Sequence, residues 1–165
     1  MSDTARALGL PGEVQWDGRA LAVSRITFEI EGRFERWLES NLLRSLEFHR
    51  GTVSADTYAL LAREANAALA ARRYAWDGEI APAAAWLGPG FRELSYLCVL
   101  DLQPAWTREE HDRLLAAPGK LAELARTIHG ITAPLKNGQP PGAAASGASS
   151  SPSAKSSPSS PLTTG

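Results

Sequence analysis

Three histidines and one cysteine are the residues of this 165-residue chain best suited to catalysis or metal binding. His49, His111 and His129 lie far apart, and none stands in the paired spacing of a zinc site. Cys98 lies in the apolar run 96–100, where a thiol keeps a high pKa and stays inert. A single thiol also excludes a disulfide within the chain. We therefore predict no metal, no cofactor and no catalytic cysteine.

The acidic residues offer one candidate for acid–base chemistry. Most of them follow helix-surface patterns that are typical of solvated faces. Asp101 follows an apolar pair, which hints at the apolar setting that an acid–base carboxyl needs, but an ion pair with an arginine or a place at a helix end explains it equally well. The Gly-Pro-Gly segment 88–90 lacks the lysine and the preceding strand of a phosphate-binding loop. A small enzyme with a site near Asp101 or His111 is one alternative hypothesis.

Charge and hydropathy exclude two classes of partner. The formal net charge is −1, and since Lys136 and Lys155 place +2 in the C-terminal segment, the rest of the chain carries −3. We find no basic stripe with interleaved aromatics of the kind that binds nucleic acid. No apolar run approaches the roughly 20 residues of a membrane span, and the N-terminus lacks the apolar segment of a signal peptide. We expect a soluble, cytosolic protein that binds neither nucleic acid nor membrane.

The elements that position these residues begin with a hairpin and a long helix. Asp17 and Gly18 between apolar-alternating segments predict a β-hairpin over 14–23, which must rest on helices to be stable. Thr27 predicts the N-cap of a helix over 28–49, ended by Gly51 in left-handed geometry. Apolar residues at 3-4-4-4 spacing predict its inner stripe, namely Phe34, Trp37, Leu38, Leu42 and Leu46.

Further helices follow along the chain. Ser54 predicts the cap of a helix over 55–73, with an alanine-rich inner face that permits close packing: Tyr58, Leu61, Ala62, Ala65 and Leu69. Pro82 predicts a short helix through Leu87, stopped by segment 88–90. The helix predicted over 91–102 is apolar on most sides, so we expect it to be central or to contact a partner.

Two last helices are predicted before the composition changes. Thr107 and Glu110 form a capping-box pattern for a helix to about 117. Pro118 starts another, which His129 and Gly130 end, with four residues facing inward: Leu121, Leu124, Ala125 and Ile128. Beyond this the chain is Ser-, Pro-, Ala- and Gly-rich and cannot bury enough surface to offset ordering entropy.

The predicted organisation is a mainly α, single small domain. It comprises a flexible N-terminus over 1–12, a helical domain with an N-terminal hairpin over 13–133, and a disordered tail over 134–165. All five tryptophans lie in the domain. Those near helix breaks either seal the core or anchor a partner, since tryptophan dominates binding hot spots. The candidate partner-binding residues are Phe34, Trp37, Trp76, Trp86, Phe91 and Trp106.

Several short segments between 14 and 129 occur in an order seen in one known family. They are WDGR at 16–19, ITF at 26–28, FERWLE at 34–39, the helix start at 54–58, YAWDG at 74–78, and the region 94–110. The last region is a helix, a proline and a second helix that begins Thr-x-Glu-Glu. In this order they resemble the tail assembly chaperones of long-tailed, siphovirus-like bacteriophages.

The resemblance implies a small, helical, non-enzymatic protein that binds the tape-measure protein, keeps it soluble and helps recruit tail-tube subunits. Such a protein acts in the host cytoplasm and is expected to be absent from the mature virion. The family supplies no catalytic residues, and no motif marks its client-binding residues. The second alternative is a structural virion component, such as a head–tail connector or a minor tail protein.

Overall fold

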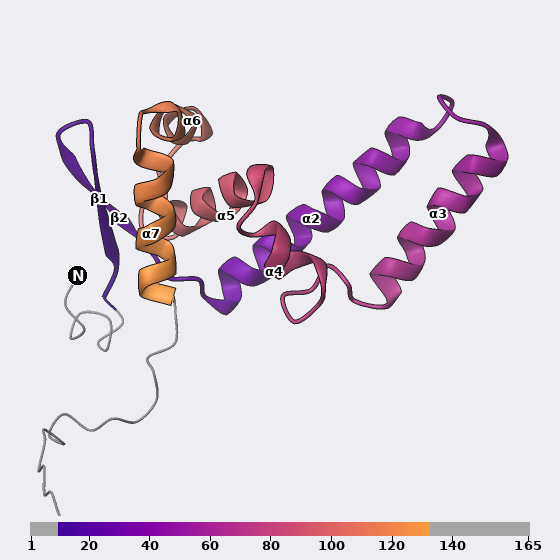
Figure 1. Ribbon diagram of the computed structural model, residues 1–165, viewed down its shortest axis with the longest axis horizontal. Coiled ribbons are helices and arrows are strands. Elements are labelled where there is room, and N and C mark those ends of the chain that lie inside the picture. The colour runs from indigo at the N-terminus through magenta and orange to yellow at the C-terminus, as the bar shows by residue number, and fades with distance from the viewer. Residues whose placement is uncertain (1–9, 133–165) are drawn as a thin grey trace, which may run out of the picture. The chain divides into compact units, whose positions relative to one another are not determined.

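The computed structural model describes residues 10–132, and its fold is mainly α, as the sequence predicts. Six helices make up 63% of the described residues, and a two-stranded antiparallel hairpin precedes them (Figure 1). The predicted flexible N-terminus and disordered tail lie outside the described residues, apart from residues 10–12. Of these, Gly12 already belongs to the first strand.

The predicted hairpin is confirmed. Strand β1 (Gly12–Trp16) pairs with β2 (Arg19–Val23), and Val14 lies opposite Leu21. Asp17 and Gly18 have φ values of 50° and 74°, as a type I′ turn requires. Val14 and Leu21 are completely buried, and helix α7 (Lys120–Thr132) packs against β1. The ribbon therefore rests on a helix, as a two-stranded sheet must.

Helix α2 (Phe28–His49) and helix α3 (Ala55–Ala70) begin at the predicted caps. Thr27 Oγ1 accepts a hydrogen bond from the Ile30 N–H at 3.3 Å, and Ser54 Oγ accepts from the Thr57 N–H at 3.2 Å. Gly51 has a φ of 81°, the left-handed geometry expected after α2. These local signals fix both starts and the turn between the two helices.

The predicted end of α3 at residue 73 is wrong. Arg72 adopts a φ of 53°, and the helix stops at Ala70. The Arg73 N–H bonds the Ala68 carbonyl at 3.0 Å and the Arg72 N–H bonds that of Leu69 at 2.9 Å. This is the Schellman pattern, here with an arginine in the position that glycine usually fills.

The predicted stop at 88–90 is also wrong, since these residues open a helix. Helix α4 (Ile80–Ala84) ends earlier, and α5 runs over Gly88–Leu100. Pro89 suits a first turn because it has no N–H to leave unpaired. A Cβ on Gly90 would lie 2.0 Å from the Ala84 carbonyl oxygen, so only glycine permits this close approach of α4 and α5.

Helix α5 is central, as predicted, with eight of its thirteen residues buried. Helix α6 (Arg108–Ala116) begins with the predicted capping box. The prediction that α7 ends at His129 is wrong, because the helix continues to Thr132 and buries Ile131 in line with Leu124 and Ile128. Leu121 does not face inward, since it is 51% exposed.

Candidate protein-binding groove

The predicted inert thiol and helix-end histidines are found where the sequence places them. Cys98 is fully buried, and burial raises its pKa to about 12, so it is not a nucleophile at neutral pH. His49 and His129 lie in the last turns of α2 and α7. Across residues 10–132, no group of three or more acidic, histidine or cysteine side chains is placed to hold a metal ion.

Ser95 and His111 form a buried pair that resembles a nucleophile and its base in residue type only. Ser95 Oγ lies 2.9 Å from His111 Nε2, and the Trp106 indole N–H donates to His111 Nδ1 at 3.3 Å. Because an indole only donates, Nδ1 accepts, and the ring proton is on Nε2. His111 therefore donates to Ser95, whose hydroxyl donates to the Arg92 carbonyl at 3.2 Å.

A catalytic base would accept the serine proton, so this pair has the reverse polarity. Burial lowers the pKa of His111 to about 4, which keeps the ring neutral. Both side chains are at most 1% exposed. Asp101 stands at the C-cap of α5, the helix-end setting considered above. The pair thus acts as a polar link between α5 and α6.

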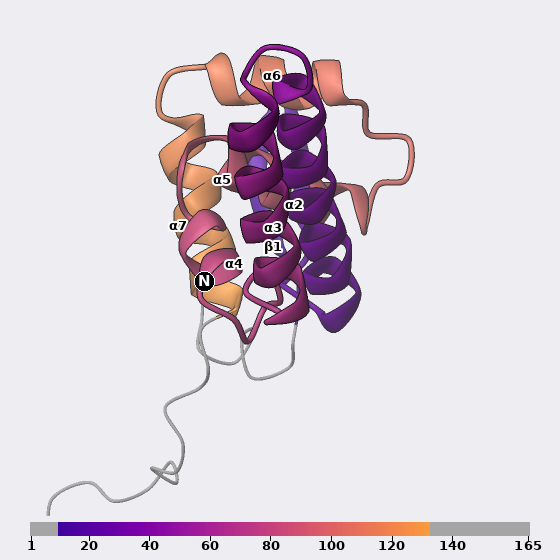
Figure 2. The same cartoon turned by 90° about the vertical axis from the view of Figure 1, so that its right-hand side faces the viewer.

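The apolar stripe of α2 continues beyond the core. Ile30, Phe34 and Leu38 are buried, whereas Leu42 and Leu46 on the following turns are only half-buried. Helix α3 packs mainly against α2, and Figure 2 shows the two helices side by side. Beyond Leu38, the apolar stripe of α2 therefore faces α3.

A groove of about 280 Å³ lies between these two helices. We call it the α2–α3 groove; its apolar lining is Leu42, Leu46, Leu61, Ala65, Ala68 and Tyr74. Polar side chains at its border are Ser45, His49, Glu64 and Arg73. The alanines of α3 keep the lining small, so that the space is left open between larger leucine side chains.

An aromatic cluster fixes the base of this helical pair to the domain. Phe34 stacks on Trp37 with ring centroids 5.6 Å apart, and it meets the edge of Trp76 at 6.1 Å. The Trp76 backbone N–H donates to the Glu35 carboxylate. The loop that follows α3 is thereby tied to α2, and the direction of the pair is set by packed rings.

The outer surface of the pair exposes further apolar side chains. Leu43, Phe48 and Leu60 are 49%, 73% and 53% exposed. A two-helix layer buries a single seam, so side chains outside that seam remain in water unless another element covers them.

The six predicted partner-binding aromatics are not brought together. Phe34, Phe91 and Trp106 are core residues with at most 5% exposure, and Trp37 and Trp76 are half-buried at the base of the helical pair. Trp86 is 40% exposed and contacts Phe91 and His129. None of the six lines the α2–α3 groove. A role for them in partner binding stays a prediction.

The sequence pattern predicts that the residues lining the groove belong to the ordinary core. Leu42 and Leu46 belong to the predicted stripe of α2, and Leu61 and Ala65 to the predicted inner face of α3. The sequence feature that could have indicated the groove is the length of α2. This helix has 22 residues and extends past the elements that can cover it.

Comparisons with protein-family models, with curated proteins and with solved structures find no match to this chain. No helix within residues 10–132 is both long enough and apolar enough to cross a membrane. The class that fold and site define is a helical protein with a hairpin-capped core and an apolar groove.

Proposed function

We propose that this chain is a non-enzymatic adaptor that holds an apolar helix of a partner protein in the α2–α3 groove. The observation that carries the proposal is the stripe of α2, which passes from the core at Phe34 and Leu38 to the groove at Leu42 and Leu46. Helix-in-groove recognition uses apolar anchors at three- and four-residue spacing on the bound helix. A groove lined by leucine and alanine accepts such anchors.

The sequence resemblance extends the proposal to a particular partner. Tail assembly chaperones bind the tape-measure protein, a long helical client with apolar faces that needs cover before assembly. We place the chain in the host cytoplasm, as an assembly factor that helps recruit tail-tube subunits and is absent from the mature virion. An apolar groove on a projecting helical pair supports this role, because a client helix can reach it without displacing core residues.

The test is co-expression with the tape-measure protein of the same phage, followed by affinity purification and measurement of the soluble client. We expect the native chain to retain the client, and Leu46→Glu to lose it, because a carboxylate in the groove opposes burial of an apolar helix. Leu121→Glu is the matched control, since Leu121 is exposed and lies outside the groove. Equal retention by all three proteins would contradict the groove.

Mass spectrometry of purified virions tests the assembly role separately. An assembly factor is absent from particles even when it is abundant in infected cells. Stoichiometric presence in particles would instead favour the structural virion component, and the groove would then be an interface of the finished tail.

A further inference from the structure

A second surface of α2 gathers positive charge. A trough of about 530 Å³ is bordered by α2, α5 and the start of α6. Trp37 and Tyr96 are among the apolar residues of its floor. Four arginines also line it, namely Arg33, Arg36, Arg44 and Arg108. We call this the arginine trough. The arginine trough and the α2–α3 groove share no lining residue.

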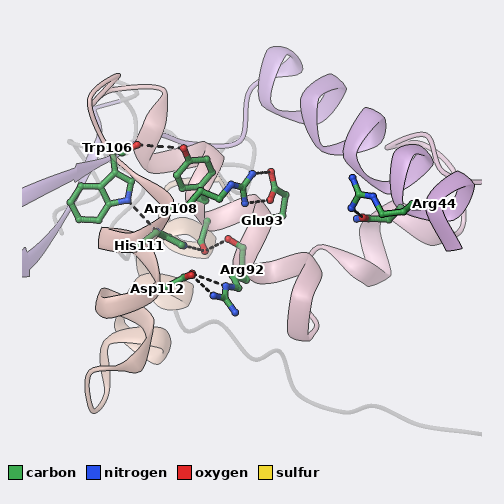
Figure 3. Close-up of polar contacts among 10 residues, drawn as sticks. Arg44, Arg92, Glu93, Trp106, Arg108, His111 and Asp112 are labelled. Atoms are coloured by element: carbon green, nitrogen blue, oxygen red, sulfur yellow. Dashed lines mark hydrogen bonds and ion pairs between the residues drawn. The ribbon is translucent and has the colours of Figure 1, made fainter. Parts of the chain in front are cut away.

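One of the four arginines is neutralised within the fold. Arg108 Nη2 donates to Glu93 Oε1 at 2.7 Å, and Nη1 donates to Oε2 of the same carboxylate (Figure 3). Glu93 is only 4% exposed, so its charge is committed to this pair. The guanidinium lies over the Tyr96 ring, 4.2 Å from its centroid. Arg108 therefore has a structural partner and shapes one end of the trough.

The other three arginines lack such partners. Arg33, Arg36 and Arg44 form no ion pair with any residue from 10 to 132, and Arg44 donates only to the Asn41 side chain, at 3.1 Å. Four arginines and one glutamate give the trough a formal charge of +3. The chain outside residues 136–165 carries −3, so this surface is opposite in sign to its own domain.

The spacing of these arginines fits an elongated partner. Arg33, Arg36 and Arg44 recur at three- and eight-residue intervals, which places them on one face of α2. The face spans about 16 Å at 1.5 Å per residue. An extended peptide covers that length with about five residues.

We propose that the arginine trough binds a short acidic segment of a partner protein in extended form. Its carboxylates would pair with Arg33, Arg36 and Arg44, because guanidinium groups match carboxylates with two parallel hydrogen bonds. An apolar side chain between them would lie on the floor of Trp37 and Tyr96. A long polyanion fits less well, because the negative domain around the trough repels its remaining charges. This site does not depend on the α2–α3 groove.

Fluorescence anisotropy of the full chain with a labelled peptide of alternating glutamate and leucine, about seven residues long, tests the proposal. We expect saturable binding that weakens with salt. The R33Q/R36Q variant should bind about tenfold more weakly or worse, while its melting temperature changes little. The R63Q/R126Q variant removes the same charge from two exposed arginines outside the trough, and its affinity should stay within about twofold.

Three results would overturn the proposal. Equal weakening in both variants would mean that net charge alone attracts the peptide. Equal affinity for a peptide with serine in place of leucine, or for a single-stranded oligonucleotide of the same charge, would make the trough a general anion surface. Absence of saturable binding at millimolar peptide would show that the trough does not bind acidic peptides.

Discussion

Acidification should destabilise this protein through His111. The ring is 1% exposed, accepts the Trp106 indole N–H on Nδ1 and contacts Ser95 through Nε2. Burial is the main cause that lowers its pKa from 6.5 to about 4, and the nearby cations Arg108 and Arg92 act in the same direction, while Asp112 opposes them. Protonation in the folded state would also break the bond from Trp106, because Nδ1 would then be a donor.

The direction of this pH effect follows from how the folded and the unfolded chain bind protons. Between pH 6.5 and about 4 the unfolded chain binds a proton on His111 that the folded chain does not, so the free energy of unfolding falls as pH falls. The difference in the His111 pKa between the unfolded and folded states corresponds to about 3 kcal/mol in the free energy of unfolding, at about 1.4 kcal/mol for each tenfold change in proton affinity. About 2 kcal/mol of it should be lost between pH 7 and pH 5.

Urea unfolding at these two pH values measures the effect, since a loss of about 2 kcal/mol lowers the midpoint by roughly 1 M. The control is His111→Asn, whose side-chain oxygen can still accept from Trp106 but does not titrate. The carboxyls of Glu110, Asp112 and Glu123 have lowered pKa values and lose their stabilisation mostly below pH 4.5, outside this window. Equal pH slopes in the native chain and in His111→Asn would refute the reasoning.

Three further predictions concern the core and its edges. Phe34→Ala should cost about 3–5 kcal/mol in urea unfolding, because the ring is completely buried against Trp37 and Trp76; a cost near zero would place it at an interface instead. Cys98 should resist a thiol reagent at pH 8 in the folded protein and react at once in denaturant, and rapid labelling of the folded chain would contradict its burial. Arg108→Ala should destabilise by about 1–3 kcal/mol because it leaves the buried Glu93 carboxylate unpaired. Arg113→Ala should change little, because Arg113, on the same helix, forms no ion pair with any of residues 10–132.

Local signals were enough to predict three of the six helix starts and the hairpin. Thr27, Ser54 and Thr107 each accept a backbone hydrogen bond at the N-terminus of the helix they precede, and that chemistry depends on neighbours in sequence only. The turn at Asp17 and Gly18 is local in the same sense. The register of β1 and β2 then follows from the turn.

Helix ends and the role of Gly-Pro-Gly were less predictable. Proline and glycine are compatible with both the end of one helix and the first turn of the next. The choice at 88–90 depends on the tight contact between Gly90 and the Ala84 carbonyl, which is a tertiary feature. The end of α3 likewise depends on Arg72 adopting a backbone conformation that its side chain disfavours.

The candidate sites could not be predicted because periodicity identifies a face and not what covers it. Leu42 and Leu46 have the same spacing as Phe34 and Leu38, yet only the latter two meet the core. The arginine trough joins side chains from three helices, with Arg108 far from Arg33 in sequence. A linear search for basic stripes finds no such site, because acidic residues lie between the arginines along α2.

Helix α2 thus contributes to the core, to the α2–α3 groove and to the arginine trough. Because the groove and the trough lie apart along and around the helix, the two binding proposals can be tested independently. Leu46 and Arg36 are ten residues apart, or about 15 Å along the axis, and lie on different faces. Substitutions separated by more than about 10 Å without shared partners act additively. Leu46→Glu should therefore leave binding of the acidic peptide unchanged, and R33Q/R36Q should leave retention of an apolar helix unchanged. If either change weakened both activities, the common element would be the aromatic base at Phe34, Trp37 and Trp76, and the two surfaces would be parts of one site.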